Sequence, residues 1–261
     1  MKNLIILCVA LTIFCLPVMA QTPTPTPLDP VAVEKQRADR LQSRLNDYGN
    51  RARYHDANTK LAPPASGEDR VVFMGDSITD FWKLNEYFPN MPYVNRGISG
   101  QTTSQMLLRF RDDAIDLKPK VVVFLAGTND ISTGNPPITL AAIEGNLASM
   151  AELSAAHGIK VVMGSVMPVS DYNLDKAGKP IIRTVQRSPA QILELNKWLK
   201  SYCAEHNFVY LDYFTATVDD KGFFKAEIAD DGLHPNAKGY AIMKPLAAEA
   251  IKAAMKSKQK M

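Results

Sequence analysis

Short apolar runs alternate with longer amphipathic segments through most of this 261-residue chain, and this alternation limits the possible folds more than any other feature. The runs are rich in β-branched residues and are bounded by Gly, Pro or Asp, which is typical of buried strands. Strands that alternate with helices form a parallel sheet with helices on both faces. The sequence therefore predicts an α/β fold with about five parallel strands, expected at 71–74, 93–95, 121–125, 160–165 and 208–211.

Segments with apolar residues at helical spacing separate these runs. In residues 102–113, for example, Met106, Leu107 and Phe110 fall on one face. No internal repeat is evident, and a chain of this length with 46% hydrophobic residues is expected to form one sizeable domain. The main helices are expected at 102–113, 138–157, 189–206 and 237–256, with a short helix directly after Ser77.

Composition excludes several classes of partner. The formal net charge of +3 is small and is spread along the chain. No run of basic residues is interleaved with aromatic residues, so nucleic acid is not predicted as a partner. No cluster of His and Cys has the spacing of metal ligands, and neither a metal nor another cofactor is predicted.

Residues 1–20 have the layout of a secretory signal peptide. Lys2 precedes an apolar core from Leu4 to Leu16, and small residues lead to a cleavage site after Ala20. The alternative is a membrane anchor, but the core is shorter than the ~20 residues that a spanning helix needs. We therefore expect export to the periplasm or the external medium, with no stable membrane insertion after cleavage.

The three cysteines agree with this interpretation. Cys8 and Cys15 leave with the signal peptide, and Cys15 follows Thr12-Ile13-Phe14 rather than small residues, so a lipoprotein anchor is not supported. Cys203 is then alone in the mature chain. It can form no internal disulfide and is expected to be a half-buried thiol on a helix.

Two segments precede the predicted domain. Residues 21–30 alternate Thr and Pro, which favours an extended linker that cannot build a core. Residues 31–66 are predicted to be an N-terminal helical extension, with one helix over 31–58 that carries a thin apolar stripe. That helix could pack on the domain, act as a spacer or bind a partner, of which the first two are favoured. The domain itself is expected to span 67–261.

Ser77 is the candidate nucleophile. The apolar run Val71–Met74 stops abruptly at Gly75-Asp76-Ser77, which predicts a buried strand that turns into a helix. Ser77 then lies at an exposed turn just past the carboxyl end of the strand, where open α/β sheets bind their ligands. Because a serine hydroxyl is a weak nucleophile near neutral pH, it needs a general base beside it.

Of the four histidines, His234 alone has a context suited to a general base. It ends the turn Asp231-Gly232-Leu233-His234, so the Asp231 carboxylate can accept its Nδ1–H and direct Nε2 toward Ser77. Taken alone this pair is weak evidence, because Asp231 could cap the last helix. His55 lies in the polar N-terminal segment. His157 and His206 each end a helix, where the helix dipole or capping accounts for them.

Three groups are candidate donors for the oxyanion that forms when an ester carbonyl is attacked. The backbone N–H of Ser77 lies at the strand-to-helix turn, and Gly100 directly precedes a helix, which is why we choose it over Gly97. The side-chain amide of Asn129 follows the most hydrophobic strand. Taken singly, Gly100 could be a turn glycine and Asn129 a cap residue. The neighbouring Asp130 is assigned to bracing the loop.

Four motifs, in this order along the chain, resemble those of the SGNH hydrolases, also called the GDSL esterase/lipase family. The resemblance covers residues from about 70 to 255. It implies Ser77 as nucleophile, His234 and Asp231 as the rest of a triad, and the Ser77 N–H, Gly100 and Asn129 as an oxyanion hole. It also implies a three-layer, flavodoxin-like α/β/α sandwich. The motifs are Gly75-Asp76-Ser77-Ile78-Thr79, Asn95-Arg96-Gly97-Ile98-Ser99-Gly100, Gly127-Thr128-Asn129-Asp130 and Asp231-Gly232-Leu233-His234-Pro235-Asn236.

One motif departs from the family pattern, since Ile78-Thr79 replaces the Leu-Ser of the family name. This variant resembles the subgroup of platelet-activating-factor acetylhydrolase and bacterial carbohydrate acetylesterases, which argues against a long-chain lipase and leaves the triad intact. Together with the signal peptide, the resemblance implies a secreted serine esterase, a carboxylic ester hydrolase acting on short acyl esters. Its expected substrates are small-molecule or carbohydrate esters, acetylated carbohydrates first among them.

Three alternatives remain open: a lysophospholipase or thioesterase, an acyltransferase with the same triad, and a non-catalytic carbohydrate-binding module on the same fold. The segment 167–188 is a further open question. It follows a strand at the same sheet edge as Ser77, so it is either a loop that shapes substrate access or a solvated surface excursion.

Overall fold

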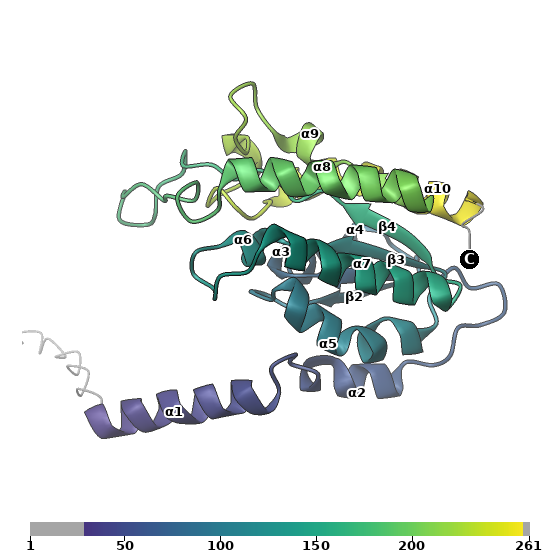
Figure 1. Cartoon of the computed structure of the whole chain (residues 1–261), viewed down its shortest axis with the longest axis horizontal. Coiled ribbons are helices and arrows are strands. Elements are labelled where there is room, and N and C mark those ends of the chain that lie inside the picture. Colours follow the sequence, from purple (N-terminus) through teal and green to yellow (C-terminus); the bar gives the residue numbers. More distant parts are fainter. Residues whose placement is uncertain (1–28, 258–261) are drawn as a thin grey trace, which may run out of the picture. The chain divides into compact units, whose positions relative to one another are not determined.

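The computed structural model describes residues 29–257, and a parallel sheet of five strands forms its centre (Figure 1). The strand order is β2-β1-β3-β4-β5, and every neighbouring pair is parallel. Each strand lies where an apolar run of the sequence predicts one, so the predicted α/β fold class is confirmed. The strands are β1 (Val71–Gly75), β2 (Tyr93–Gly97), β3 (Val121–Leu125), β4 (Lys160–Gly164) and β5 (Val209–Leu211).

Helices fill the connections between the strands, and most start at a recognisable cap. Thr139, Ser188 and Asn236 each accept a backbone N–H of the first turn of the following helix. The α-helices are α1 (Pro30–Asn46), α2 (Ala52–Lys60), α3 (Ser77–Asp80), α4 (Leu84–Tyr87), α5 (Thr103–Asp113), α6 (Thr128–Ile131), α7 (Leu140–Ala156), α8 (Pro189–His206), α9 (Tyr213–Thr217) and α10 (Ala237–Lys256). Two short 3₁₀ helices are η1 (Ile115–Leu117) and η2 (Ala226–Ile228).

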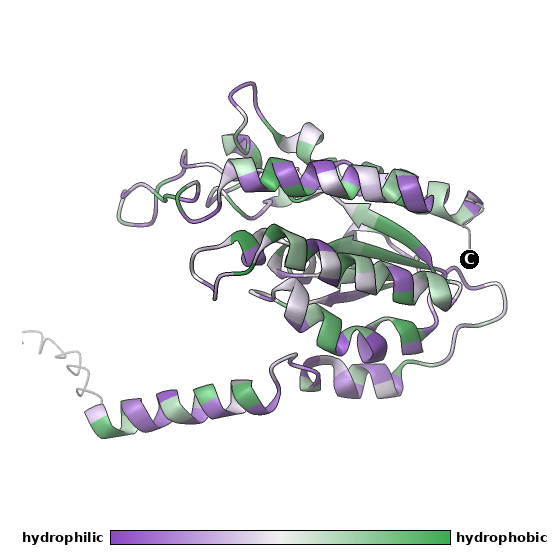
Figure 2. Ribbon diagram, viewed as in Figure 1, coloured by the Kyte–Doolittle hydropathy of each residue, from purple (hydrophilic) through white to green (hydrophobic). Residues whose placement is uncertain are grey.

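Helices cover both faces of the sheet, because the side chains of the central strands point alternately to the two sides. Val72 and Met74 of β1 pack in one core with residues of α5, α7 and α8. Val71 and Phe73 pack in a second core with residues of α3, α4 and α10. As a result β1 and β3 are buried at every position. In Figure 2 the central strands are mostly hydrophobic, and the helices beside the sheet are of mixed polarity, in agreement with three layers.

The segment predicted as one helix over 31–58 forms two helices instead. The Asp47 carboxylate accepts the N–H groups of Arg51 and Ala52, each at 2.9 Å, and so ends α1 and starts α2. Asn50 between them adopts a left-handed conformation with φ of 51°. The chain divides after Ser43 into two compact units, and all elements from α2 onward belong to the second.

Helix α2 packs on the domain through polar contacts. The Tyr54 hydroxyl donates to the Gly97 carbonyl at 2.5 Å, and Asn58 Nδ2 donates to Asp113 Oδ1 at 2.6 Å. Both contacts reach elements that flank Gly100, since Gly97 ends β2 and Asp113 ends α5. Three roles were left open for residues 31–58. For the part that forms α2, the structure shows packing on the domain.

Within residues 29–257 no helix is both long enough and apolar enough to cross a membrane. The predicted signal peptide, 1–20, and most of the predicted linker, 21–30, lie outside the described residues. Cys203 is fully buried in α8 rather than half-buried, and this burial raises the pKa of its thiol to about 12.

Candidate active site

Ser77 lies at a sharp turn between β1 and α3, at the carboxyl edge of the sheet. Gly75 permits this turn, because a Cβ there would lie 2.2 Å from Thr79 Oγ1 and 2.6 Å from the Leu125 carbonyl oxygen. Asp76 caps α3, since its carboxylate accepts the N–H of Ile78 at 3.0 Å. The sequence predicts an exposed serine, but Ser77 is only 7% exposed, because the turn that carries His234 packs against it.

Three side chains predicted from two separate motifs are in contact. Ser77 Oγ lies 2.9 Å from His234 Nε2, and His234 Nδ1 lies 2.8 Å from Asp231 Oδ2. A carboxylate can only accept a hydrogen bond, so Nδ1 carries the ring proton in this pair. Nε2 is then free to accept the hydroxyl proton of Ser77. This is the arrangement of a nucleophile, a base and an orienting carboxylate.

The turn Asp231–His234 holds both of its catalytic candidates in place. Asp231 Oδ1 accepts the N–H groups of Leu233 at 3.0 Å and His234 at 2.8 Å. Burial alone would raise the pKa of the Asp231 carboxyl, but these bonds and the His234 side chain together hold that pKa well below its ordinary range. Gly232 has a φ of 72°, and a Cβ there would lie 2.1 Å from the Ser170 carbonyl oxygen. The turn therefore requires glycine at this position.

The other histidines have structural surroundings. His157 Nδ1 bonds to the Leu153 carbonyl at 2.8 Å where α7 ends, and the His206 ring packs on the Tyr202 ring at 4.2 Å between centroids. His55 lies in α2. Of the four, His234 is the one that contacts Ser77.

The two glycines of the second motif have different surroundings, which supports the choice of Gly100. Gly97 is packed tightly, since a Cβ there would lie 2.2 Å from the Asp80 backbone nitrogen. Its own N–H is used, because it donates to Asn95 Oδ1 at 2.8 Å. Gly100 has a φ of 80° and open space around its Cβ position, in the turn before α5. A left-handed, uncrowded glycine suits a backbone donor that a substrate must approach closely.

Asn129 is tied to the segment that follows Gly100. Its Nδ2 donates to the Gln101 carbonyl at 3.1 Å, and its own carbonyl accepts from Asn135 Nδ2 at 2.7 Å. Gly127, with φ of 116°, starts the short helix α6 that carries Asn129. The second and third motifs, far apart in sequence, are thus joined by a direct hydrogen bond.

Asp130 braces the loop, as its sequence context predicts. Its two carboxylate oxygens accept the Thr103 N–H at 3.0 Å each, and Oδ1 also accepts the Thr103 hydroxyl at 2.6 Å. Burial raises the pKa of this carboxyl, and the bonds from Thr103 partly offset that rise. Asp130 thereby fixes the start of α5, the element that follows Gly100.

Arg109 is a residue that the sequence argument missed. Its guanidinium is fully buried and donates to three groups: Gln101 Oε1 at 2.6 Å, Asp113 Oδ2 at 2.9 Å and the Gly75 carbonyl at 3.2 Å. It therefore links the residue before Asp76-Ser77 with the residue after Gly100. The sequence shows only an arginine within an amphipathic helix, so nothing local signals this role.

The loop between β4 and α8 contacts the site through Arg183, which the sequence argument also did not assign. Arg183 Nη2 donates to Asp231 Oδ2, and Nε donates to the Asp231 carbonyl, both at 2.9 Å. Asp171 shapes the loop around this contact, because its Oδ1 accepts the Arg183 N–H at 2.6 Å and its Oδ2 accepts the Thr184 hydroxyl at 2.6 Å. This part of the segment 167–188 is therefore joined to the site and is not a purely solvated excursion.

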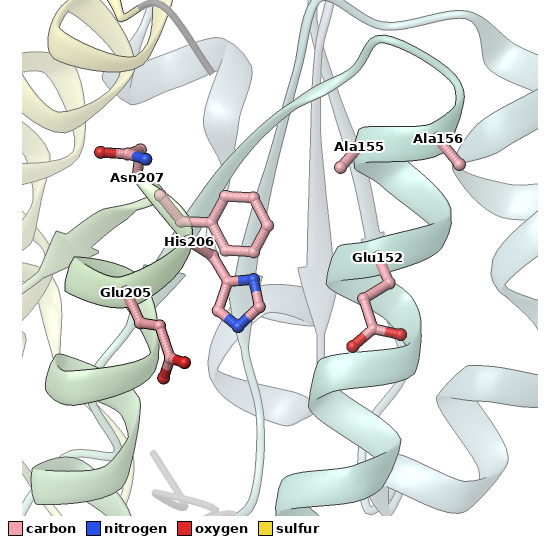
Figure 3. A pocket seen from close by; sticks show the side chains of 7 residues that line it. Glu152, Ala155, Ala156, Glu205, His206 and Asn207 are labelled. Carbon is pink, nitrogen blue, oxygen red and sulfur yellow. The ribbon is translucent and has the colours of Figure 1, made fainter. Parts of the chain in front are cut away.

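A hollow of about 440 Å³ lies at the other edge of the sheet, where α7 and α8 end and β4 and β5 begin. Figure 3 shows the His206 ring between the side chains of Glu152 and Glu205 in this hollow. Its lining contains none of the residues that contact Ser77. Among the described residues, no group of three or more His, Cys, Asp or Glu side chains could hold a metal ion.

Comparisons with known proteins agree on one family. The model of the GDSL-like lipase/acylhydrolase family matches residues 73–242, a range that contains every candidate site residue. The chain is 34% identical over 159 residues to the uncharacterized lipoprotein YqeF of Bacillus subtilis, covering 52% of this chain and 64% of that protein, which is less than two thirds of its length. It is 24% identical over 211 residues to an acetylxylan esterase of Geobacillus stearothermophilus, covering 68% of this chain and 91% of that protein.

Two solved structures from Bacteroides align over nearly their whole length. A GDSL-like lipase from Bacteroides thetaiotaomicron has 37% sequence identity and a TM-score of 0.71, covering 79% of this chain and 99% of that structure. A structure from Bacteroides fragilis has 34% identity and a TM-score of 0.73, covering 80% and 99%. With its fold, motifs and family match in agreement, this chain belongs to the GDSL-like lipase/acylhydrolase family, the SGNH hydrolases.

Proposed function

We propose that this protein is an exported serine esterase that removes short acyl groups, chiefly acetyl, from carbohydrates. The observation that carries the proposal is the hydrogen-bonded chain from Ser77 through His234 to Asp231, with separations of 2.9 and 2.8 Å. A hydroxyl beside an unprotonated ring nitrogen can pass its proton to that nitrogen as it attacks a carbonyl carbon.

In the first half of the reaction, Ser77 Oγ bonds to the carbonyl carbon of the ester while its proton moves to His234 Nε2. The carbonyl oxygen becomes an oxyanion that accepts from the N–H groups of Ser77 and Gly100 and from Asn129 Nδ2. The negative charge of Asp231 stabilises the imidazolium. The C–O bond to the alcohol then breaks, the alcohol takes the proton from His234, and the acyl group stays on Ser77.

In the second half, a water molecule attacks the acyl carbon and gives its proton to His234. The bond between the acyl carbon and Ser77 Oγ breaks, the serine oxygen recovers the proton from His234, and the carboxylic acid leaves. The same three side chains therefore serve both halves, and every proton that His234 accepts is returned.

Two observations support a carbohydrate ester as the substrate. One relative in sequence is an acetylxylan esterase. The second is Phe81, which is 53% exposed although its ring centroid lies 5.4 Å from that of His234. An exposed aromatic ring beside the base offers an apolar face against which the C–H face of a sugar ring can pack, since aromatic rings contribute large contact areas.

Export is supported by the sequence of residues 1–20, which has the charge, apolar core and small-residue site of a signal peptide. The Bacillus subtilis relative YqeF is a lipoprotein, which supports export of this chain as well. An exported esterase would meet acetylated polysaccharides or oligosaccharides outside the cell.

Hydrolysis of p-nitrophenyl esters from acetate to palmitate, measured beside Ser77→Ala, tests this proposal. We expect the rate to be highest for acetate and to fall by more than about 1,000-fold in Ser77→Ala, because the nucleophile is lost. His157→Ala is the matched control and should retain the parental rate, since that ring bonds only to the end of α7. Acetylated xylo-oligosaccharides should be deacetylated by the same Ser77-dependent activity.

The other outcomes would contradict parts of the proposal. A maximum at eight or more carbons would favour a lipid or thioester substrate over an acetyl ester. Activity in Ser77→Ala within tenfold of the parent would exclude Ser77 as nucleophile. No activity on any ester, with a folded parent, would favour a non-catalytic binding module.

A further inference from the structure

Arg187 ends the loop between β4 and α8, and its guanidinium is buried beside Asn129. The residue is 8% exposed. Its Nη2 donates to Asn129 Oδ1 at 3.3 Å, and its Nη1 donates to Gln186 Oε1 at 3.5 Å. Its Nε is buried and has no hydrogen-bond partner among the residues that the structure describes. One face of this side chain is therefore directed at a candidate oxyanion donor, and the rest is poorly paired.

Among residues 29–257, no carboxylate neutralises this buried charge by direct contact. Among the ion pairs formed by residues 29–257, none includes Arg187. Burial lowers the pKa of Arg187, and the charge of Arg183 lowers it further, while Asp76 and Asp231 attract it through space. A buried charge without an ion-pair partner and with an unpaired donor costs stability. Such an exception calls for a functional explanation.

The partners of Asn129 determine which way its amide points. The Gln101 carbonyl can only accept, and a guanidinium can only donate. Nδ2 must therefore face Gln101, at 3.1 Å, and Oδ1 must face Arg187. Nδ2 carries two hydrogens, of which one serves Gln101, so the second is left for an oxyanion. Arg187 is the donor to Oδ1 that holds this orientation from the other side.

We propose that Arg187 is a positioning residue of the oxyanion hole, an inference that rests on the proposed function. Its guanidinium fixes the Asn129 amide and draws electron density toward Oδ1, which makes the remaining N–H a stronger donor. Its positive charge also favours the negatively charged transition state over the neutral ester. Because the effect grows only as the oxyanion forms, it raises kcat and leaves KM nearly unchanged.

The test compares Arg187→Met, Arg187→Lys and the exposed loop control Lys176→Met with the parent on p-nitrophenyl acetate. We expect kcat to fall roughly 10- to 100-fold in Arg187→Met, less than the loss typical of removing a donor itself, with KM within about twofold. Arg187→Lys keeps a positive charge near Oδ1 and should recover part of the lost kcat. Lys176→Met should match the parent, since Lys176 is exposed.

Binding of a boronic acid analogue of the transition state separates positioning from a structural role. Its affinity should fall in Arg187→Met by about the same factor as kcat, because a tetrahedral boronate carries the charge of the oxyanion. A merely structural role would lower the melting temperature and affect substrate and boronate binding alike, without recovery by lysine.

The outcomes distinguish the two proposals. Ser77-dependent hydrolysis together with kcat of Arg187→Met within twofold of the parent would overturn the role of Arg187 alone. So would a loss of kcat without a matching loss of boronate affinity. Absence of any Ser77-dependent hydrolysis in the parent would overturn the proposed function and, with it, the role of Arg187.

Discussion

Asp76 and Asp231 are neighbours of the same serine and histidine, yet their surroundings push their pKa values in opposite directions. Asp231 accepts two backbone N–H groups and the His234 ring, and these contacts outweigh the effect of burial, so that the pKa of its carboxyl is lowered. Burial dominates at Asp76, where the N–H of Ile78 and the His234 charge only partly compensate, and raises its pKa to about 7. Asp231 has more hydrogen-bond donors around it than Asp76 has. Asp231 is therefore suited to orient a base as a carboxylate, whereas Asp76 caps a helix.

Asp76→Asn is expected to raise the melting temperature by roughly 4 °C at pH 8 and to change the melting temperature little near pH 4. The folded-state pKa of about 7 lies above the unfolded value of ~3.9, so between these values the folded state binds more protons. The stability of the parent therefore falls as pH rises through this window. Asn keeps an acceptor for the Ile78 N–H and removes the charge.

Melting temperatures of parent and variant at pH 4, 6 and 8 check this sign. If the difference in melting temperature between parent and variant does not depend on pH, Asp76 is ionised across the whole range, and burial does not raise its pKa.

At the residue scale, the sequence revealed a site residue only where that residue lies in a local motif. Ser77 and His234 are 157 positions apart, but each lies in a local motif whose turn chemistry can be read by itself. Arg183 lies 48 positions from Asp231, and Arg187 lies 58 positions from Asn129, in a loop without periodicity. No local pattern announces these arginines, because their importance comes only from the partner that the fold brings to them.

The elements around the site were predictable to different degrees. Strands β1 and β3 are continuous apolar runs that end at a glycine or a turn. The sequence therefore predicts that each strand exists and where it lies. The break between α1 and α2 was missed, although Gly49 lies in it. The turn is formed by Asp47, which accepts two backbone N–H groups, and by a left-handed Asn50. Helix α5 was predicted as an amphipathic helix, yet its fully buried Arg109 connects two parts of the site.

Arg109→Met is expected to lower the free energy of unfolding by about 3–5 kcal/mol, because it leaves the Asp113 carboxylate buried without its ion-pair partner. The Gln101 side chain and the Gly75 carbonyl would lose a donor at the same time. For a domain of this size, the melting temperature should fall by about 10 °C.

Arg111→Met is the matched control on the same helix. Its guanidinium is exposed and lies 3.8 Å from Asp116, so its loss should cost less than about 1 kcal/mol. Thermal and urea unfolding of both variants measure the difference. Equal, small effects would contradict the role assigned to Arg109.

At the scale of the whole molecule, the parallel sheet gathers the parts of the site at one edge. The segments that follow β1, β2 and β3 contain Ser77, Gly100 and Asn129, respectively. The turn before α10 places His234 against Ser77, with Asp231 behind the histidine. The loop after β4 adds Arg183 to Asp231 and Arg187 to Asn129. The family's chemistry therefore depends on a scaffold that the sequence predicts well and on nonlocal contacts that it does not.

The most direct test of the account is covalent labelling of the purified protein with a fluorophosphonate, followed by mass spectrometry of its peptides. The account predicts one label per chain, on the peptide that contains Ser77, no label in Ser77→Ala, and labelling at least about 100-fold slower in His234→Ala, because the base is lost. Labelling at another serine, or equal rates with and without His234, would contradict a serine nucleophile activated by this histidine.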